Sequence, residues 1–367
     1  MRKLYGSIKY KQYSRKRARK ELKARSRFAS YLHQKEIKKI GKSLINYRHR
    51  RDWKVDVVAP RDFSVRTNPE KVIRFINRIE ACLESKKSVF IVMKNVESID
   101  YGSIAVLFSI MELFQIKGIP FNGDMPLNEE ANMKLHDSKF FDELYKNKHK
   151  VHKFEPQQRT DGNRLFKRTE RKVEPQLGLQ VMIQASTALW GEKKLCKGLQ
   201  RILLELMHNT NNHAGGTGKQ GDERWCISVN HNRKENKVEF VFVDYGVGIF
   251  NSLQHKPKGN KWYGWKDKLK RVTGGGDSMF TNELILQKLL QGEIHASVTG
   301  QSFRGKGLPG IKQVAVRNQV SNLFVLSNNA YADTGNNKYL LLNNDFSGTF
   351  VYWELCYSNE NKLWTVR

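Results

Sequence analysis

Three polar side chains in the C-terminal half of the chain follow one another at helical spacing. Glu205, Asn209 and Asn212 lie at positions i, i+4 and i+7 of the segment LQRILLELMHNTNNHA, and therefore form a strip along one side of a helix. The carbonyl oxygen of Asn209 is suited to bind a hard Mg²⁺ ion. The carboxylate of Glu205 is suited to take a proton from an attacking water molecule. The same spacing also occurs on ordinary solvated helix faces, so it decides nothing alone.

A second candidate group lies at the end of an apolar strand, in VEFVFVDYGVGIF. A carboxylate at the position of Asp244 can accept a hydrogen bond from an exocyclic amine such as that of adenine. Gly246 and Gly248 follow it, and they would let the backbone approach a ligand where a Cβ atom would clash. Many ordinary turns share this pattern, which makes it a weak signal by itself.

Two further segments carry groups that suit a nucleotide. In FRGKGLPGIKQV, Gly305, Gly307 and Gly310 surround the expected start of a helix. The free N–H groups of that helix, together with Lys306, would bind an anion, and the alternative is a surface turn. In SGTFVYWEL, the hydroxyl of Thr349 at the start of a strand could join the hydrogen bonds around an adenine, and the alternative is an ordinary strand.

A set of helices and strands must position these groups, and the periodicity predicts an α/β unit over residues 179–367. The expected helices cover residues 192–214 and 280–290, and the first has an apolar face formed by Leu199, Ile202, Leu203 and Leu206. The expected strands lie near residues 225–230, 238–243, 323–326 and 348–355.

The segment 53–150 alternates between strand and helix patterns. VDVVAP, SVFIVM and IPFNG read as strands, whereas PEKVIRFINRIEACLE, SIAVLFSIMELFQIKG and NEEANMKLHDSKFFDELY read as helices. This alternation predicts an α/β layer with parallel strand pairing. Residues 151–178 are polar and weakly periodic, and they are interpreted as a linker.

Taken together, the motifs of the C-terminal half resemble those of the GHKL ATPase superfamily, which has the Bergerat fold. ELMHNTNNH, DYGVGI, GKGLPG and GTFVYWEL occur in the order and spacing of that group, which includes histidine kinases, anti-sigma-factor serine kinases, gyrase-type topoisomerases and heat-shock chaperones. The resemblance covers residues 180–357 and implies an α/β sandwich that binds ATP and Mg²⁺.

The resemblance also implies roles for individual residues. Glu205 would be the general base, Asn209 the metal ligand and Asp244 the adenine contact. His213 lies where relatives often carry a histidine or a lysine. Residues 249–305 would form a mobile lid over the phosphates, with TGGGDS as a hinge-like stretch.

The segment SVFIVMKNVESIDYGSIAVLFSIMELFQIKGIPFNG resembles a STAS domain, the fold of anti-sigma-factor antagonists. Those antagonists carry a phosphorylatable serine directly after the aspartate of this turn. Here Tyr101 and Gly102 follow Asp100, and Ser103 is displaced. We therefore expect Ser103 to cap the following helix rather than to accept phosphate.

The net charge of +29 is concentrated at the N-terminal end. Residues 1–54 contain 20 Lys or Arg and three acidic residues, a net charge of +17, with tyrosines interleaved. Residues 1–52 are interpreted as a basic arm that binds nucleic acid, because neutralised phosphates release counterions and aromatic rings stack on bases. A membrane surface or an acidic protein partner is the alternative.

The function expected from these features is that of an ATP-dependent switch with slow hydrolysis, which couples nucleotide state to a STAS-like module and a basic arm. One alternative is a protein serine/threonine kinase like the anti-sigma factors, and another is a non-hydrolysing nucleic-acid-binding protein with structural ATP. We expect no dimerisation helix with a phosphoacceptor histidine before residue 192 and no transducer domain after the last strand, which disfavours sensor kinases and topoisomerases.

A cytoplasmic location is expected for the chain. No apolar run reaches the length of a membrane span, since even residues 103–114 are too short and include Glu112. We expect no secretory signal, because no apolar stretch follows the basic N-terminal residues. Four cysteines lie far apart in the sequence, as is typical of core-filling thiols in a reducing compartment.

Overall fold

The structure is a computed structural model that describes residues 54–145, 164–170, 173–213, 224–233, 235–254, 280–293 and 307–366. The predicted basic arm and most of the predicted lid lie outside these ranges. Val55–Arg367 forms one compact unit, distinct from Met1–Lys54. Within the described ranges, no helix has both the length and the apolar character needed to cross a bilayer.

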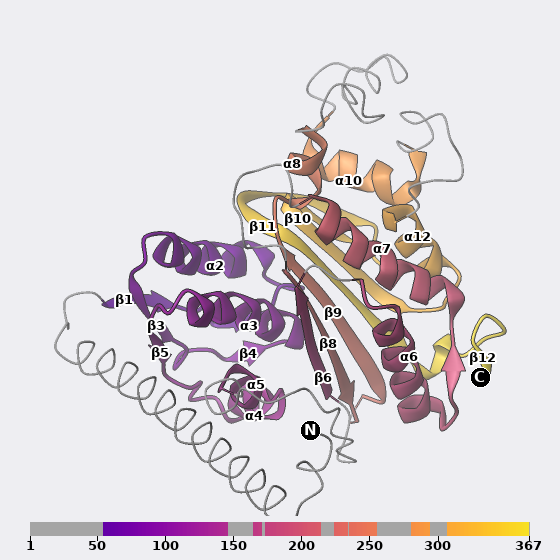
Figure 1. The fold of residues 1–367 in the computed structure, drawn as a ribbon, viewed down its shortest axis with the longest axis horizontal. Helices are drawn as coiled ribbons and strands as arrows, with labels where there is room; N and C mark the ends of the chain where they lie inside the picture. Colours follow the sequence, from indigo (N-terminus) through magenta and orange to yellow (C-terminus); the bar gives the residue numbers. More distant parts are fainter. Residues whose placement is uncertain are drawn as a thin grey trace, which may run out of the picture. The chain divides into compact units, whose positions relative to one another are not determined.

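The N-terminal part of this unit is a parallel sheet with alternating helices, as the sequence predicts (Figure 1). Strands β1 (Lys54–Val58), β3 (Ser88–Val92) and β5 (Phe121–Gly123) lie in that order, and β3 pairs with β5 in parallel. The short strands β2 (Asp62–Phe63) and β4 (Ser98–Ile99) also pair in parallel. The helices are α2 (Pro69–Glu84), α3 (Tyr101–Ile116), α4 (Glu129–Asp137) and α5 (Phe140–Tyr145).

The last helical segment of this part is interrupted, although the sequence predicts a single helix. Between α4 and α5 the chain turns at Ser138 and Lys139, where Lys139 adopts a φ of 54° in the left-handed region. The Ser138 hydroxyl donates a hydrogen bond to the carbonyl oxygen of Leu135 and accepts one from the Phe140 amide, which gives one terminal group of each helix a partner.

The C-terminal part is an antiparallel sheet with helices. Its strand order is β10 (Ser321–Asp333), β11 (Lys338–Cys356), β9 (Lys237–Tyr245), β8 (Arg224–Asn232) and β6 (Arg164–Glu170), and each neighbouring pair is antiparallel. The helices are α6 (Pro175–Trp190), α7 (Lys197–His213), α8 (Gly248–Gln254), α10 (Asn282–Gln291) and α12 (Gly307–Val316). The short strand β7 (Lys194–Leu195) pairs with β12 (Thr365–Val366), and the 3₁₀ helix η5 (Tyr357–Asn359) lies before β12.

The structure corrects three predicted segments. The segment interpreted as a linker contains strand β6, which lies at the sheet edge and whose sequence RLFKRTE has few apolar residues, and it also contains the start of α6. The helix expected from residue 192 begins at Lys197, since β7 precedes it. The two late strands are longer than predicted and form one hairpin, so that Thr349 lies inside β11 and not at its start.

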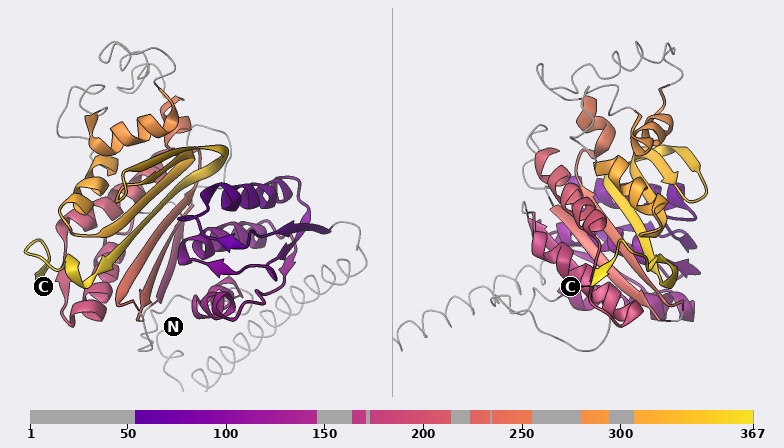
Figure 2. Two further views of the ribbon diagram at one scale, coloured as in Figure 1. Left: turned by 180° about the vertical axis from the view of Figure 1, so that it is seen from behind. Right: turned by 90° about the vertical axis from the view of Figure 1, so that its right-hand side faces the viewer.

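Both faces of strand β9 in the C-terminal sheet are buried. Phe240 and Phe242 of β9 belong to a core with α6 and α7, which cover one face of the sheet (Figure 2). Val241, Val243 and Tyr245 alternate with them and belong to a second core that includes α2 and α3. Burial on both faces explains why the sequence of β9 is almost continuously apolar.

Three of the four cysteines fill the cores, as predicted. Cys82, Cys196 and Cys226 are buried and Cys356 is partly buried, and all four are free thiols.

Candidate functional site

Asp244 lies near the C-terminal end of β9 and is the centre of a buried polar cluster. One carboxylate oxygen accepts a hydrogen bond of 2.8 Å from the Thr349 amide on the neighbouring strand β11. The other accepts a hydrogen bond of 3.1 Å from the Thr210 hydroxyl on α7. The structure thus brings together two residues that the sequence predicted, Asp244 and Thr349, which directly oppose each other in the β9–β11 register.

The environment of Asp244 disfavours its charge. Burial, the largest influence, raises the pKa of Asp244 from its ordinary value of 3.8 to about 6, although the hydrogen bonds from Thr210 and Thr349 lower it. Its partners among the described residues are hydroxyl and amide groups rather than a cation. A buried carboxylate whose pKa is raised towards neutral pH is the kind of group that occurs at functional sites.

The glycine turn after Asp244 is held by a bulge in β10. The Ile249 amide donates to the Ser327 hydroxyl over 2.9 Å, and the Phe250 amide donates to the Asn328 side-chain oxygen over 3.1 Å. The Asn328 side chain also donates to the Val247 carbonyl, and the register of β10 shifts at Ser327 and Asn328. Strand β10, which lies two places from β9 in the sheet, therefore fixes the conformation of this turn.

The two glycines of this turn differ in what requires them. Gly248 has a φ of 72°, and a Cβ atom there would overlap the Asn328 side chain, so the protein's own packing explains this glycine. Gly246 is exposed, and a Cβ atom there would meet no atom within 4 Å. Open space at Gly246 is compatible with a ligand that approaches the backbone.

Helix α7 presents its predicted apolar face to the core. Leu199, Ile202, Leu203 and Leu206 are all buried. Glu205 is partly buried at the edge of this face. Asn209 and His213 lie on the last turns of α7, where the structure describes the backbone but not these side chains.

Helix α12 packs against α7, which brings the third motif to the same region. A Cβ atom at Gly310 would lie 3.9 Å from Ile202, so the two helices approach closely there. Gly307 is the first residue of α12. Gly305 and Lys306 lie outside the described residues, and so does most of the predicted lid between α8 and α12.

Three residues of this site were missed by the sequence analysis. Thr210 follows Asn209 directly, and its place beside the polar strip of α7 was a signal that could have found it. Ser327 and Asn328 had no such signal, because only the pairing of β10 with β11 brings them to the glycine turn.

The turn before α3 contradicts the predicted role of Ser103. Asp100 is the N-cap of α3, and its side chain accepts a hydrogen bond of 2.7 Å from the Ser103 amide. The Ser103 hydroxyl is fully buried and accepts a hydrogen bond of 2.8 Å from the Val65 amide. The aspartate provides the cap because its carboxylate precedes the first helical residue, whereas Ser103 already lies within the helix.

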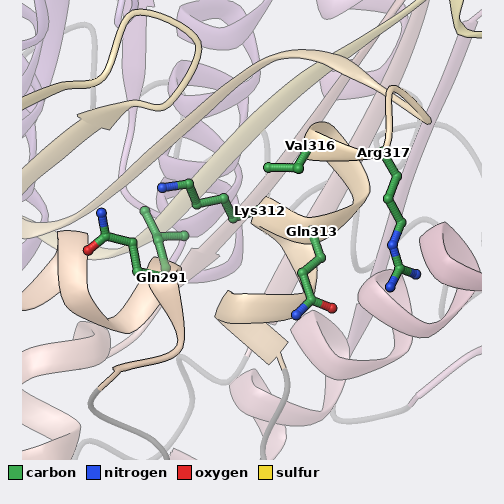
Figure 3. Close-up of a pocket in the computed structure, with 6 residues that line it drawn as sticks. Gln291, Lys312, Gln313, Val316 and Arg317 are labelled. Carbon is green, nitrogen blue, oxygen red and sulfur yellow. The ribbon is translucent and has the colours of Figure 1, made fainter.

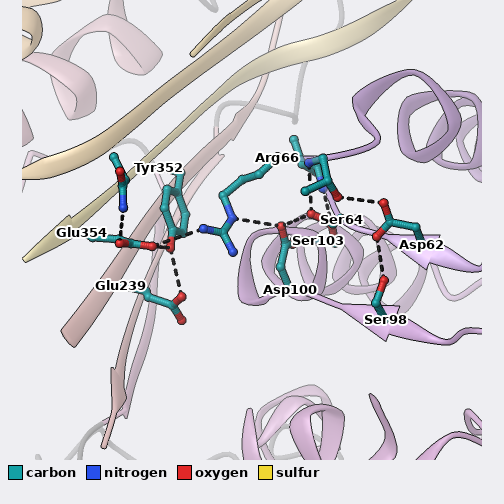
Figure 4. A network of polar contacts seen from close by, with 12 residues as sticks. Asp62, Ser64, Arg66, Ser98, Asp100, Ser103, Glu239, Tyr352 and Glu354 are labelled. Carbon is teal, nitrogen blue, oxygen red and sulfur yellow. Dashed lines mark hydrogen bonds and ion pairs between the residues drawn. The ribbon is translucent and has the colours of Figure 1, made fainter. Parts of the chain in front are cut away.

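A charge network joins this turn to the C-terminal sheet (Figure 4). The Arg66 guanidinium lies 3.3 Å from Asp100 and 3.2 Å from Glu354 of β11, and it covers the Tyr352 ring at 4.6 Å. Glu354 also accepts a hydrogen bond of 2.9 Å from Lys237. Burial lowers the pKa of Arg66, but Tyr352 and the nearby carboxylates outweigh that effect and raise it above its usual range.

A surface hollow lies elsewhere, between α10 and α12 (Figure 3). Its lining residues are Leu290, Gln291, Lys312, Gln313, Val316 and Arg317. None of these lining residues belongs to the predicted site.

Among the residues that the structure describes, no group of three or more His, Cys, Asp or Glu side chains is arranged to hold a metal ion. Compared with known proteins, the chain matches no family model, no curated protein and no solved structure at a significant level. The arguments for function therefore rest on the geometry of the site itself.

Proposed function

We propose that the chain is an ATP-dependent switch with slow hydrolysis, built on a Bergerat-type nucleotide domain and a STAS-like layer. The observation that carries this proposal is the buried Asp244 carboxylate, which is paired with Thr349 and Thr210 at the end of β9. After these two hydrogen bonds, its oxygens retain lone pairs that can accept one more donor, such as the amino group of adenine.

The surroundings of Asp244 are compatible with such a ligand. Gly246 has free space above its backbone, and Glu205 lies partly buried on α7, the helix that also supplies Thr210. The motifs that carry the resemblance lie in turn on α7, at the end of β9, at the start of α12 and in β11.

In this proposal, bound ATP with Mg²⁺ supplies a phosphoanhydride bond that can be hydrolysed. Glu205 serves as the general base that takes a proton from water, and Asn209 is the protein's ligand to the metal. Gly305, Lys306, Gly307 and His213 are proposed to bind the phosphates, which would lie near the N-terminal end of α12.

Calorimetry with ATP, GTP and Mg²⁺ tests the binding step, and the wild-type chain should prefer ATP. No measurable ATP binding would refute the proposal. The fate of the phosphate then separates the alternatives. Release of inorganic phosphate supports the switch, transfer to a protein supports a serine/threonine kinase, and turnover at background level supports a nucleic-acid-binding protein with structural ATP.

We propose nucleic acid as the partner of residues 1–52, on the basis of their charge and interleaved tyrosines. A partner protein is proposed for the STAS-like layer. A pull-down with and without a non-hydrolysable ATP analogue would identify that partner and its dependence on nucleotide together.

A further inference from the structure

The side chains that flank Asp244 and Thr349 point away from the proposed nucleotide side. Along β9 and β11, successive side chains alternate between the two faces of the sheet. Tyr245, which follows Asp244, and Phe350, which follows Thr349, are therefore buried in the core shared with the N-terminal layer. Asp244 and Thr349, the two candidate adenine contacts, thus lie on one face of the sheet. The side chains of Tyr245 and Phe350 pack on the opposite face.

Helix α3 contacts both of these neighbours with one face. A Cβ atom at Gly102 would lie 3.0 Å from the tip of the Phe350 ring, so the ring is already close to the helix backbone. One turn later, the Val106 carbonyl accepts a hydrogen bond of 3.3 Å from the Tyr245 hydroxyl. Gly102 and Val106 are four residues apart and hence lie on the same side of α3.

Close packing also constrains the distance between β9 and β11 beside Asp244 and Thr349. At Gly348, which precedes Thr349, a Cβ atom would overlap the Asp244 carbonyl group. The Phe350 side chain is fully buried, and packed interiors transmit a displacement instead of absorbing it. A shift of Phe350 would therefore move the Thr349 amide, whose hydrogen bond orients the Asp244 carboxylate.

We infer that α3 positions the nucleotide site, with Gly102 and Val106 setting the relative placement of Thr349 and Asp244 through Phe350 and Tyr245. This inference rests on the proposed function and adds the physical route by which the STAS-like layer and the nucleotide site are coupled. Gly102 and Val106 are positioning residues, since neither is proposed to touch the ligand.

The test compares two glycine-to-alanine changes in buried first turns of helices. In Gly102→Ala the new Cβ atom meets Phe350 at 3.0 Å, whereas in Gly178→Ala of α6 it meets Leu203 at an ordinary 3.7 Å. We expect Gly102→Ala to weaken ATP binding roughly 2- to 30-fold, the range typical of mutations that change coupling between sites. Gly178→Ala should bind ATP like the wild type.

Two measurements separate positioning from simple destabilisation. Hydrogen exchange at the Thr349 amide should accelerate in Gly102→Ala, but not in Gly178→Ala, in the absence of nucleotide. Adding Phe350→Leu to Gly102→Ala should restore ATP affinity, because the smaller side chain makes room for the new Cβ atom. If Gly102→Ala fails to fold, Phe350→Leu alone should weaken ATP binding by loosening the same contact.

The possible failures are distinguishable. ATP binding by Gly102→Ala or by Phe350→Leu equal to that of the wild type would overturn the positioning role and leave the proposed function intact. A wild-type chain that does not bind ATP would overturn the proposed function. In that case unchanged exchange at the Thr349 amide would also overturn the positioning of the Asp244–Thr349 pair, and accelerated exchange would uphold it.

Discussion

Replacing Asp244 with asparagine separates the energetic cost of the buried carboxylate from its proposed role in binding adenine. The amide fits the existing hydrogen bonds. Its oxygen can accept from the Thr349 amide, and its NH₂ group can donate to the Thr210 hydroxyl, which lies 3.2 Å from the Leu206 carbonyl and can donate to it. We therefore expect Asp244→Asn to fold.

The energetic cost of the buried Asp244 carboxylate follows from its raised pKa. Between its ordinary value of 3.8 and about 6, the unfolded chain has lost this proton while the folded protein keeps it, so the free energy of unfolding falls as the pH rises. At about 1.4 kcal/mol per pH unit, the wild type loses about 3 kcal/mol across this interval. Asp244→Asn lacks this loss and should be the more stable protein above pH of about 6.

Urea unfolding followed by tryptophan fluorescence, at a series of pH values from about 4 to 8, measures this difference. The gap between variant and wild type should open as the pH rises to about 6 and then stay constant. Parallel pH profiles for the two proteins would refute the reasoning.

The same variant should bind ATP more weakly by about 1–3 kcal/mol, with GTP less affected, because the amide presents a mismatched donor to adenine. Unchanged discrimination between ATP and GTP would remove Asp244 from the adenine site.

Three further predictions concern other parts of the chain. Glu205→Ala should retain ATP binding but lose hydrolysis by a factor on the order of 10² to 10⁴, and wild-type turnover would contradict its role as base. Arg66→Met should lower the free energy of unfolding by about 3 kcal/mol in urea titrations, because it leaves buried carboxylates short of a cation. The control Arg61→Met breaks an ion pair whose side chains are 77% and 64% exposed and should cost at most about 1 kcal/mol. Equal losses of unfolding free energy in the two variants would refute the expected difference between the buried and the exposed ion pair. Deleting residues 1–52 should abolish salt-dependent nucleic-acid binding without affecting ATP affinity, and the idea fails if the truncated chain binds DNA or RNA with the same salt dependence.

The sequence by itself determined the elements whose side chains repeat with a clear period. The apolar face of α7 is buried as its spacing predicts, with Glu205 at the edge. The alternation of strands and helices in the N-terminal layer predicted parallel pairing, and β3 and β5 pair in that way. Periodicity is a local property, because it records which side of an element is to be buried.

Only the tertiary structure decided which elements meet. Strand β6 pairs with β8 through backbone hydrogen bonds, which leave little trace in side-chain type. The bulge at Ser327 and Asn328 supports the glycine turn only because the β10–β11 hairpin brings it there. The sequence predicted β9 as an apolar strand but could not say that α3 covers one of its faces. A sequence encodes how apolar each face is, whereas the partner of that face depends on contacts between residues far apart in the chain.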